Sequence, residues 1–173
     1  AHLVNKKGVK PENILAITFT NKAAGEMRER ARKLLRRNEN VNIMTFHALG
    51  YSILKKYPKL ARREVGFTIL DDREQMAILR GLGVEPKTMK GVRKMISEQK
   101  QNVGAGLVPA QNSAENTDQR VTTRVTPTGD WFEKYEQKLK EKNAFDFDDM
   151  LYHAVMILSD FPEILKEYRQ QFS

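Results

Sequence analysis

The hydrophobic and polar positions near the start of the chain predict two short strands, each followed at once by a helix. Residues 14–20 form a β-branched and apolar run that is too short for a buried helix and suits a buried strand. After Asn21, apolar residues recur at helical spacing and the opposite face is strongly basic. Residues 41–45 predict a second strand, and Thr45 is expected to cap a helix over residues 46–57.

The middle of the chain has the pattern of surface helices. Asp71 and Glu74 stand three residues apart at the start of an apolar-periodic run, which is the spacing of a capping box. A further helix is predicted over residues 88–101, with its apolar residues toward the core. Lys100 is assigned to the solvent side of this helix, together with the other basic residues.

Residues 102–128 interrupt the helical pattern. This stretch has little apolar mass and many glycine, proline, serine, threonine and asparagine residues. Such a composition buries too little apolar surface to offset the entropy of ordering the chain. We therefore predict a long loop or a disordered tract here.

Helical periodicity resumes after this tract. Asp130 and Glu133 have the spacing of a second capping box. Farther on, residues 146–149 (DFDD) are expected to open another helix, with Phe147 facing the core.

Three carboxylates within residues 146–149 also raise the question of a metal site. Acidic residues are favoured in the first turn of a helix by its dipole, which explains them without a metal. The sequence pattern supplies no histidine or further carboxylate cluster that would complete a coordination shell. We therefore predict a helix start and no metal site.

Composition and charge narrow the classes of function. With 30 lysines and arginines against 22 aspartates and glutamates, the formal net charge is +8, which favours a polyanionic partner. The absence of cysteine excludes disulfides and thiolate zinc sites. No apolar run approaches the ~20 residues of a membrane span, and nothing resembles a signal peptide. A cytoplasmic setting without membrane partners is expected.

The residue identities in three segments are more specific than their hydrophobic pattern. Residues 18–27 (TFTNKAAGEM) resemble motif Ia of the UvrD/Rep family of superfamily 1 DNA helicases. Residues 45–47 (TFH) resemble motif Ib of that family. Residues 146–151 (DFDDML) resemble the segment that precedes its Walker B strand. The three matches occur in the family's order, and the resemblance covers residues 1–101 and 130–173.

The resemblance implies a helix-rich α/β fold, with a partial RecA-like parallel sheet of the P-loop NTPase type and an inserted helical subdomain. Residues 1–65 would belong to motor domain 1A, between the Walker A and Walker B motifs. Residues 66–144 would form a helical subdomain like 1B, including the tract at 102–128. Residues 145–173 would return to domain 1A.

The implied function is that of a part of an ATP-dependent 3′→5′ DNA helicase and translocase. Its partners would be single-stranded and duplex DNA and the remaining motor domains, and its cofactors ATP and Mg²⁺. The phosphate-loop sequence G-x-x-x-x-G-K-[ST] does not occur in these 173 residues. We therefore expect no bound cofactor, no catalytic residue and no ATP hydrolysis by this chain alone. Two alternatives stay open: a non-enzymatic DNA-binding or interaction module, and a part of a helicase–nuclease.

The resemblance also assigns DNA contacts to particular residues. A strand that leads into a helix through a polar turn places free backbone N–H groups at a helix N-terminus, where phosphate commonly binds. The implied single-strand contacts are Phe19 for a base, Thr20 and Asn21 for the strand-end contacts, and Thr45 with His47 for a second grip. Candidate phosphate contacts are Arg28, Lys55 and Lys56. The alternatives are a structural His47, a Phe19 packed in the core, and a basic run that is only a solvated face.

Overall fold

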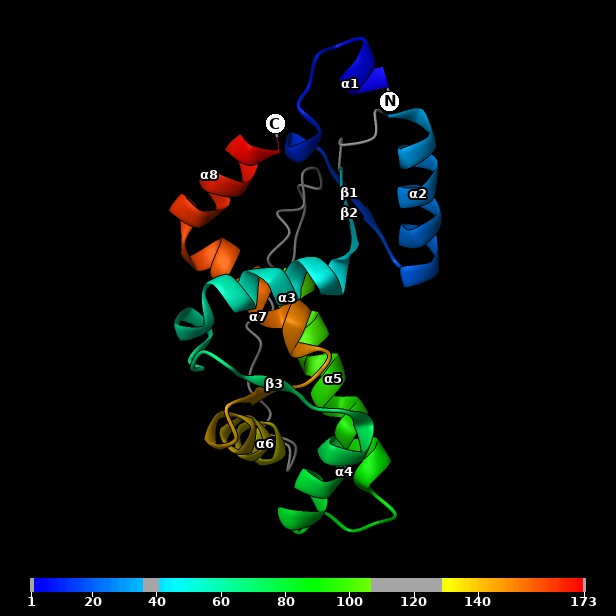
Figure 1. Ribbon diagram of the computed structural model, residues 1–173. Coiled ribbons are helices and arrows are strands. Elements are labelled where there is room, and N and C mark those ends of the chain that lie inside the picture. The colour runs from blue at the N-terminus through cyan, green and yellow to red at the C-terminus, as the bar shows by residue number, and fades with distance from the viewer. Residues whose placement is uncertain (1, 36–40, 107–128, 173) are drawn as a thin grey trace, which may run out of the picture.

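The computed structural model describes residues 2–35, 41–106 and 129–172. In chain order the elements are α1 (His2–Asn5), the 3-10 turn η1 (Pro11–Asn13), β1 (Leu15–Thr18), α2 (Asn21–Leu34), β2 (Asn42–Thr45), α3 (Phe46–Lys56), the 3-10 turn η2 (Pro58–Ala61), β3 (Thr68–Ile69), α4 (Asp72–Gly81), α5 (Met89–Gly106), α6 (Gly129–Glu141), β4 (Ala144–Phe145), α7 (Asp149–Asp160) and α8 (Pro162–Gln171). Figure 1 shows β1 and β2 beside α2 at one end of the molecule, α3 crossing near α7 in the middle, and α4 and α6 at the other end.

Two short parallel strand pairs set the path of the chain. β1 pairs with β2, with Leu15 opposite Asn42 and Thr18 opposite Thr45. β3 pairs with β4, which is completely buried. Because parallel strands end at the same edge, α2 and α3 both begin beside the carboxyl ends of β1 and β2. This edge becomes the candidate site.

Side-chain packing divides into two hydrophobic cores. The first lies among α4, α5 and α6 and is formed by Leu70, Ile78, Leu79, Val84, Met89, Ile96, Tyr135, Leu139 and Ala144. The second lies among α3, η2, α7 and α8 and is formed by Ile53, Leu54, Ala61, Phe145, Met150, Ala154, Ile157 and Ile164. The successive β4 residues Ala144 and Phe145 belong to different cores, so this strand lies where the two cores meet.

Several predictions of local structure are confirmed. The chain is a helix-rich α/β structure with small parallel sheets. The hydroxyl oxygen of Thr45 accepts the backbone N–H of Ala48 at 3.1 Å and caps α3. Asp71 and Glu74 form the complete capping box of α4. None of the described helices is long and apolar enough to cross a membrane.

Other local predictions are wrong. Helix α5 continues to Gly106, so residues 102–106 are helical and do not begin a loop. Asp130 lies inside α6, where its carboxylate pairs with Lys134 at 2.6 Å, and so does not cap the helix from outside. Strand β1 is only partly buried. The remainder of the predicted loop, residues 107–128, lies outside the described residues.

Helices α3 and α7 pack closely because α3 carries glycine at the point of contact. A Cβ atom built on Gly50 would collide with the backbone carbonyl of Met150 and lie 3.6 Å from the Cβ of Ala154. Backbone atoms cannot move aside as a flexible side chain can, so only glycine permits this approach. The contact fixes the N-terminal half of α3 relative to the start of α7.

Replacing Gly50 with alanine is expected to lower the free energy of unfolding by about 1–3 kcal/mol, because it overpacks the contact between α3 and α7. Gly25→Ala in α2 is the matched control, since its added Cβ would meet no atom within 4 Å. That change should leave stability unchanged or raise it by up to about 1 kcal/mol, because alanine favours a helix. Thermal melts followed by circular dichroism compare the two; equal melting temperatures would contradict the close contact.

Candidate nucleic-acid interface

The first feature of the candidate site is a pair of helix N-termini at one edge of the β1–β2 pair. The hydroxyl oxygen of Thr20 accepts the backbone N–H of Ala23 at 3.1 Å, and Thr45 caps α3 in the same way. Thr20 and Asn21 are exposed, whereas Thr45 is buried. Remaining first-turn N–H groups and the helix dipoles make this edge suitable for anions. Thr45 would act by holding the start of α3.

The second feature is a group of exposed aromatic rings beside these N-termini. Phe19 is 86% exposed, and its ring centroid lies 5.3 Å from that of Phe46. His47 stacks on Phe147 with a centroid distance of 3.9 Å and an interplanar angle of 22°. We call Phe19, Phe46, His47 and Phe147 the aromatic surface. The alternative that Phe19 packs in the core is wrong.

The position of Phe147 differs from the prediction. It was expected to face the core, yet its side chain is 53% exposed. The reason is the turn that precedes α7: the backbone N–H of Asp146 donates to Asp149, and that of Asp149 donates to Asp146, each at 2.9 Å. Both carboxylates are buried, and of the two residues between them Phe147 is the exposed one. The spacing of two aspartates three apart was the available signal for this reciprocal arrangement.

His47 is a neutral ring at physiological pH. Partial burial lowers its pKa below the ordinary value, and the nearby carboxylate of Asp148 offsets this only in part. The imidazole therefore stacks on Phe147 without a positive charge. A neutral flat ring beside a phenyl ring is a surface on which a base can stack.

The three candidate phosphate contacts have different surroundings. Arg28 donates to the backbone carbonyl of Ile43 at 2.8 Å, and the Lys56 ammonium lies 2.6 Å from Glu167. Lys55 is exposed and has no hydrogen bond or ion pair to the residues that the structure describes. Of the three, Lys55 is the side chain that could reach a phosphate without first giving up a protein partner.

A buried ionic cluster lies behind the turn that carries Phe147. The ammonium of Lys100 lies 2.6 Å from Asp149, 2.7 Å from Asp146 and 2.8 Å from Glu136. The Arg63 guanidinium is 4.0 Å from Glu136. We call these five residues the Lys100 cluster. Lys100 is only 1% exposed, so its assignment to the solvent side of α5 is wrong.

Lys100 keeps its charge despite this burial. Removal from water by itself lowers its pKa, but the attraction of Asp149, Asp146 and Glu136 is larger in sum and raises the pKa above the ordinary value. Burial raises the pKa of Asp149, and the attraction of Lys100 opposes this only in part. The negative charges of Asp146 and Glu136 act in the same direction as burial.

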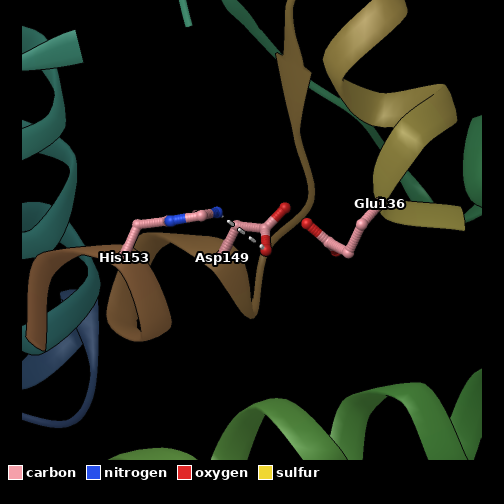
Figure 2. Close-up of side chains that lie close together, drawn as sticks. All are labelled: Glu136, Asp149 and His153. Carbon is pink, nitrogen blue, oxygen red and sulfur yellow. Dashed lines mark ion pairs between the residues drawn. The ribbon is translucent and has the colours of Figure 1, made fainter. Parts of the chain in front are cut away.

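The same region contains a group with metal-ligand residue types. Donor atoms of Glu136, Asp149 and His153 lie within 4.8 Å of one another, so the expectation that no histidine or further carboxylate would join Asp149 is wrong. Figure 2 shows Asp149 and His153 on α7 and Glu136 reaching toward them from α6. However, the Lys100 ammonium already lies within ion-pair distance of two of these donors. An ammonium occupies the place that a metal cation would need, and the arrangement is a salt-bridge cluster.

Two capped helix N-termini with aromatic rings beside them form a surface that suits a nucleic acid. Sequence comparison is specific: the chain belongs to the UvrD/REP helicase N-terminal domain family, whose model matches residues 1–173. The match includes residues 102–128, so the expectation that the resemblance stops at 101 and restarts at 130 is wrong.

Three relatives illustrate the similarity. The chain is 34% identical over 185 residues to the ATP-dependent DNA helicase PcrA of Leuconostoc citreum, with 99% of this chain and 23% of the relative covered. It is 32% identical over 182 residues to PcrA of Staphylococcus aureus (99% and 24%) and 31% identical over 179 residues to PcrA of Bacillus subtilis (99% and 23%). The chain spans about a quarter of the length of these relatives.

His153 lies beside the Lys100 cluster, 3.8 Å from Asp149, and should make the stability of the native chain depend on pH. Burial, together with the positive charges of Arg63 and Lys100, lowers the pKa of His153 to about 3. Between about pH 6.5 and pH 3 the unfolded chain therefore binds a proton that the native chain does not, and native stability is lost as pH falls. His153→Gln should make stability fall less steeply in this window, by at most about 1.4 kcal/mol per pH unit.

Urea unfolding of the wild type and His153→Gln at several pH values measures this difference. Other titrating groups are common to both proteins, so their contributions cancel to first order. His2→Gln, which changes a histidine outside the cluster, is the control and should keep the wild-type slope. Parallel pH profiles for the wild type and His153→Gln would contradict a neutral buried His153.

Proposed function

We propose that this chain supplies single-stranded DNA contacts to an ATP-dependent DNA helicase that translocates in the 3′→5′ direction. Membership in the UvrD/REP helicase N-terminal domain family and its similarity to the ATP-dependent DNA helicases PcrA support this class of function. The observation that carries the proposal is the aromatic surface beside two helix N-termini, because it offers stacking and anion binding at one edge.

In this proposal the aromatic surface binds bases. Phe19 is the most exposed large apolar side chain among the residues that the structure describes, so its ring is accessible to a base. The stacked pair of His47 and Phe147 offers a second platform, and Phe46 lies against Phe19. Base–aromatic stacking contributes about 1–3 kcal/mol per base and tolerates any sequence, as a translocating enzyme requires.

The phosphates of the DNA strand would lie along the N-termini of α2 and α3. Thr20 and Asn21 are exposed at the start of α2, and Thr45 holds the start of α3. Lys55, exposed and unpaired among the described residues, is the best candidate for a direct phosphate contact. Arg28 and Lys56 would have to exchange the Ile43 carbonyl and Glu167 for a phosphate. The net charge of +8 makes such binding salt-dependent.

The rest of the proposal concerns the longer helicase. Residues 1–65 and 145–173 would form part of a RecA-like motor domain 1A, and residues 66–144 a helical subdomain like 1B. In support, the second core is built from residues before 66 and after 144, whereas the first is built from residues between them. ATP, Mg²⁺, duplex DNA and the remaining motor domains belong to the longer protein, in a cytoplasmic setting. We assign no side chain of this chain to ATP or Mg²⁺.

Phe19→Ala is expected to weaken binding of a fluorescein-labelled oligo-dT, because it removes a stacking contact of about 1–3 kcal/mol. The dependence of affinity on salt should stay the same, since the number of phosphate contacts does not change. Fluorescence anisotropy over a salt series measures both quantities. Binding equal to that of the wild type would remove Phe19 from the interface.

Two matched variants make this test specific. Leu34→Ala also removes an exposed apolar side chain, but at the far end of α2, about 20 Å along the helix, and should leave affinity unchanged. Lys55→Ala should instead flatten the salt dependence by about one counterion, because it removes a phosphate partner. Circular dichroism of all variants confirms that each is folded.

A further inference from the structure

We infer that Lys100 is a positioning residue for the proposed DNA surface: from α5 it holds the turn of residues 146–149 in the form that presents Phe147 to His47. The inference rests on the proposed function, since it assigns a purpose to a ring that is proposed to contact DNA. It concerns a side chain that is itself buried and cannot touch a nucleic acid.

The contacts of α5 bracket Phe147 on both sides. The Lys100 ammonium pairs with Asp146 at 2.7 Å, immediately before Phe147, and with Asp149 at 2.6 Å, two residues after it. The neighbouring Gln101 donates to Asp148 at 3.4 Å. Helix α5 therefore makes polar contacts to Asp146, Asp148 and Asp149, which lie on either side of the exposed Phe147 along the chain.

The turn needs the ammonium because its two aspartates are buried next to each other. Asp146 and Asp149 are each less than 4% exposed and are linked by their reciprocal backbone hydrogen bonds. Two carboxylates held this close in a medium of low dielectric repel each other and are poorly solvated. Without Lys100, the turn would relieve this cost by taking up a proton or by rotating a carboxylate toward water. Rotation of either residue moves Phe147, which lies between them.

This arrangement ties the aromatic surface to the first hydrophobic core. Met89 and Ile96 anchor α5 in that core, whereas His47 lies on α3, which packs against α7 in the second core. A displacement of α5 that moves Lys100 would change its ion pairs with Asp146 and Asp149. The stacking of Phe147 on His47 would then change as well. The orientation of Phe147 in the proposed DNA surface therefore depends on the position of α5 in the first core.

The Lys100 cluster offers a matched pair of variants. Asp149→Asn and Glu136→Gln each remove one negative charge and one ion pair with Lys100, at 2.6 Å and 2.8 Å. Both leave two carboxylates facing Lys100 and Arg63, so the two variants change the formal charge of the cluster equally. Only Asp149 lies in the turn; Glu136 reaches the cluster from α6. One oxygen of Asp149 accepts the backbone N–H of Asp146 and the other faces Lys100, so an asparagine that keeps the hydrogen bond turns its amide N–H donors toward the ammonium and breaks the tie between the turn and Lys100.

The direct readout is the NMR signal of the His47 ring protons, which the ring current of Phe147 shifts while the two rings are stacked. His47→Gln assigns these signals, and Phe147→Ala defines their unstacked position. We expect Lys100→Met and Asp149→Asn to move the signals toward the Phe147→Ala position, and Glu136→Gln to leave them at the wild-type position. If Lys100→Met does not fold, Asp149→Asn against Glu136→Gln decides the question.

Two results would overturn the inference. Unshifted His47 signals in folded Asp149→Asn would mean that the turn holds Phe147 without its tie to Lys100. An equal shift in Glu136→Gln would mean that the cluster only stabilises the chain and does not position the ring. A structural role alone predicts similar effects for the two members of the matched pair.

A second arm uses oligo-dT binding by the same variants. Phe147→Ala should weaken binding about tenfold, Lys100→Met should approach the same loss, and the double variant should lose no more than Phe147→Ala. Wild-type affinity in Phe147→Ala would remove this ring from the proposed DNA surface. The His47 signals would still decide the positioning role, so the two failures are distinguishable.

Discussion

The interaction on which the structure most depends is the buried ammonium of Lys100 among three carboxylates. Removing a charged group from water costs several kcal/mol, so such a group persists inside a protein only when its partners are close and well oriented. Here Asp146, Asp149 and Glu136 all lie within 2.8 Å of the ammonium nitrogen. Because these partners come from α6 and from residues 146–149, where α7 begins, the requirement fixes three segments at once, where the two cores meet.

The aromatic surface depends on that junction and on one close helix contact. Gly50 lets the backbones of α3 and α7 approach, which sets His47 relative to the start of α7. The reciprocal hydrogen bonds of Asp146 and Asp149 then turn Phe147 outward against His47. The orientation of the stacked rings of His47 and Phe147 is thus set by buried contacts. A proposed single-strand grip built in this way uses rings whose orientation is set before DNA arrives, which reduces the entropy lost on binding.

Local features such as helix caps are predictable from the sequence, whereas the Lys100 cluster is not. The caps at Thr45 and Asp71 depend on residues three positions apart, and both are confirmed. Lys100 was placed outside because of its charge, although it follows Ile96 by four residues and shares its helical face. The spacing pointed inward, but the compensating carboxylates lie 36 to 49 residues farther along the chain. Such long-range pairing is not contained in any local pattern, and neither is the outward position of Phe147 that depends on it.

We propose that the aromatic surface at the N-termini of α2 and α3 receives single-stranded DNA. Its most direct test is titration of the isotopically labelled chain with oligo-dT, followed residue by residue through NMR chemical shifts. The signals of Phe19, Asn21, His47 and Phe147 should change in a saturable way, whereas those of α4 should stay in place. Saturable changes centred on α4, with the aromatic surface unmoved, would contradict it.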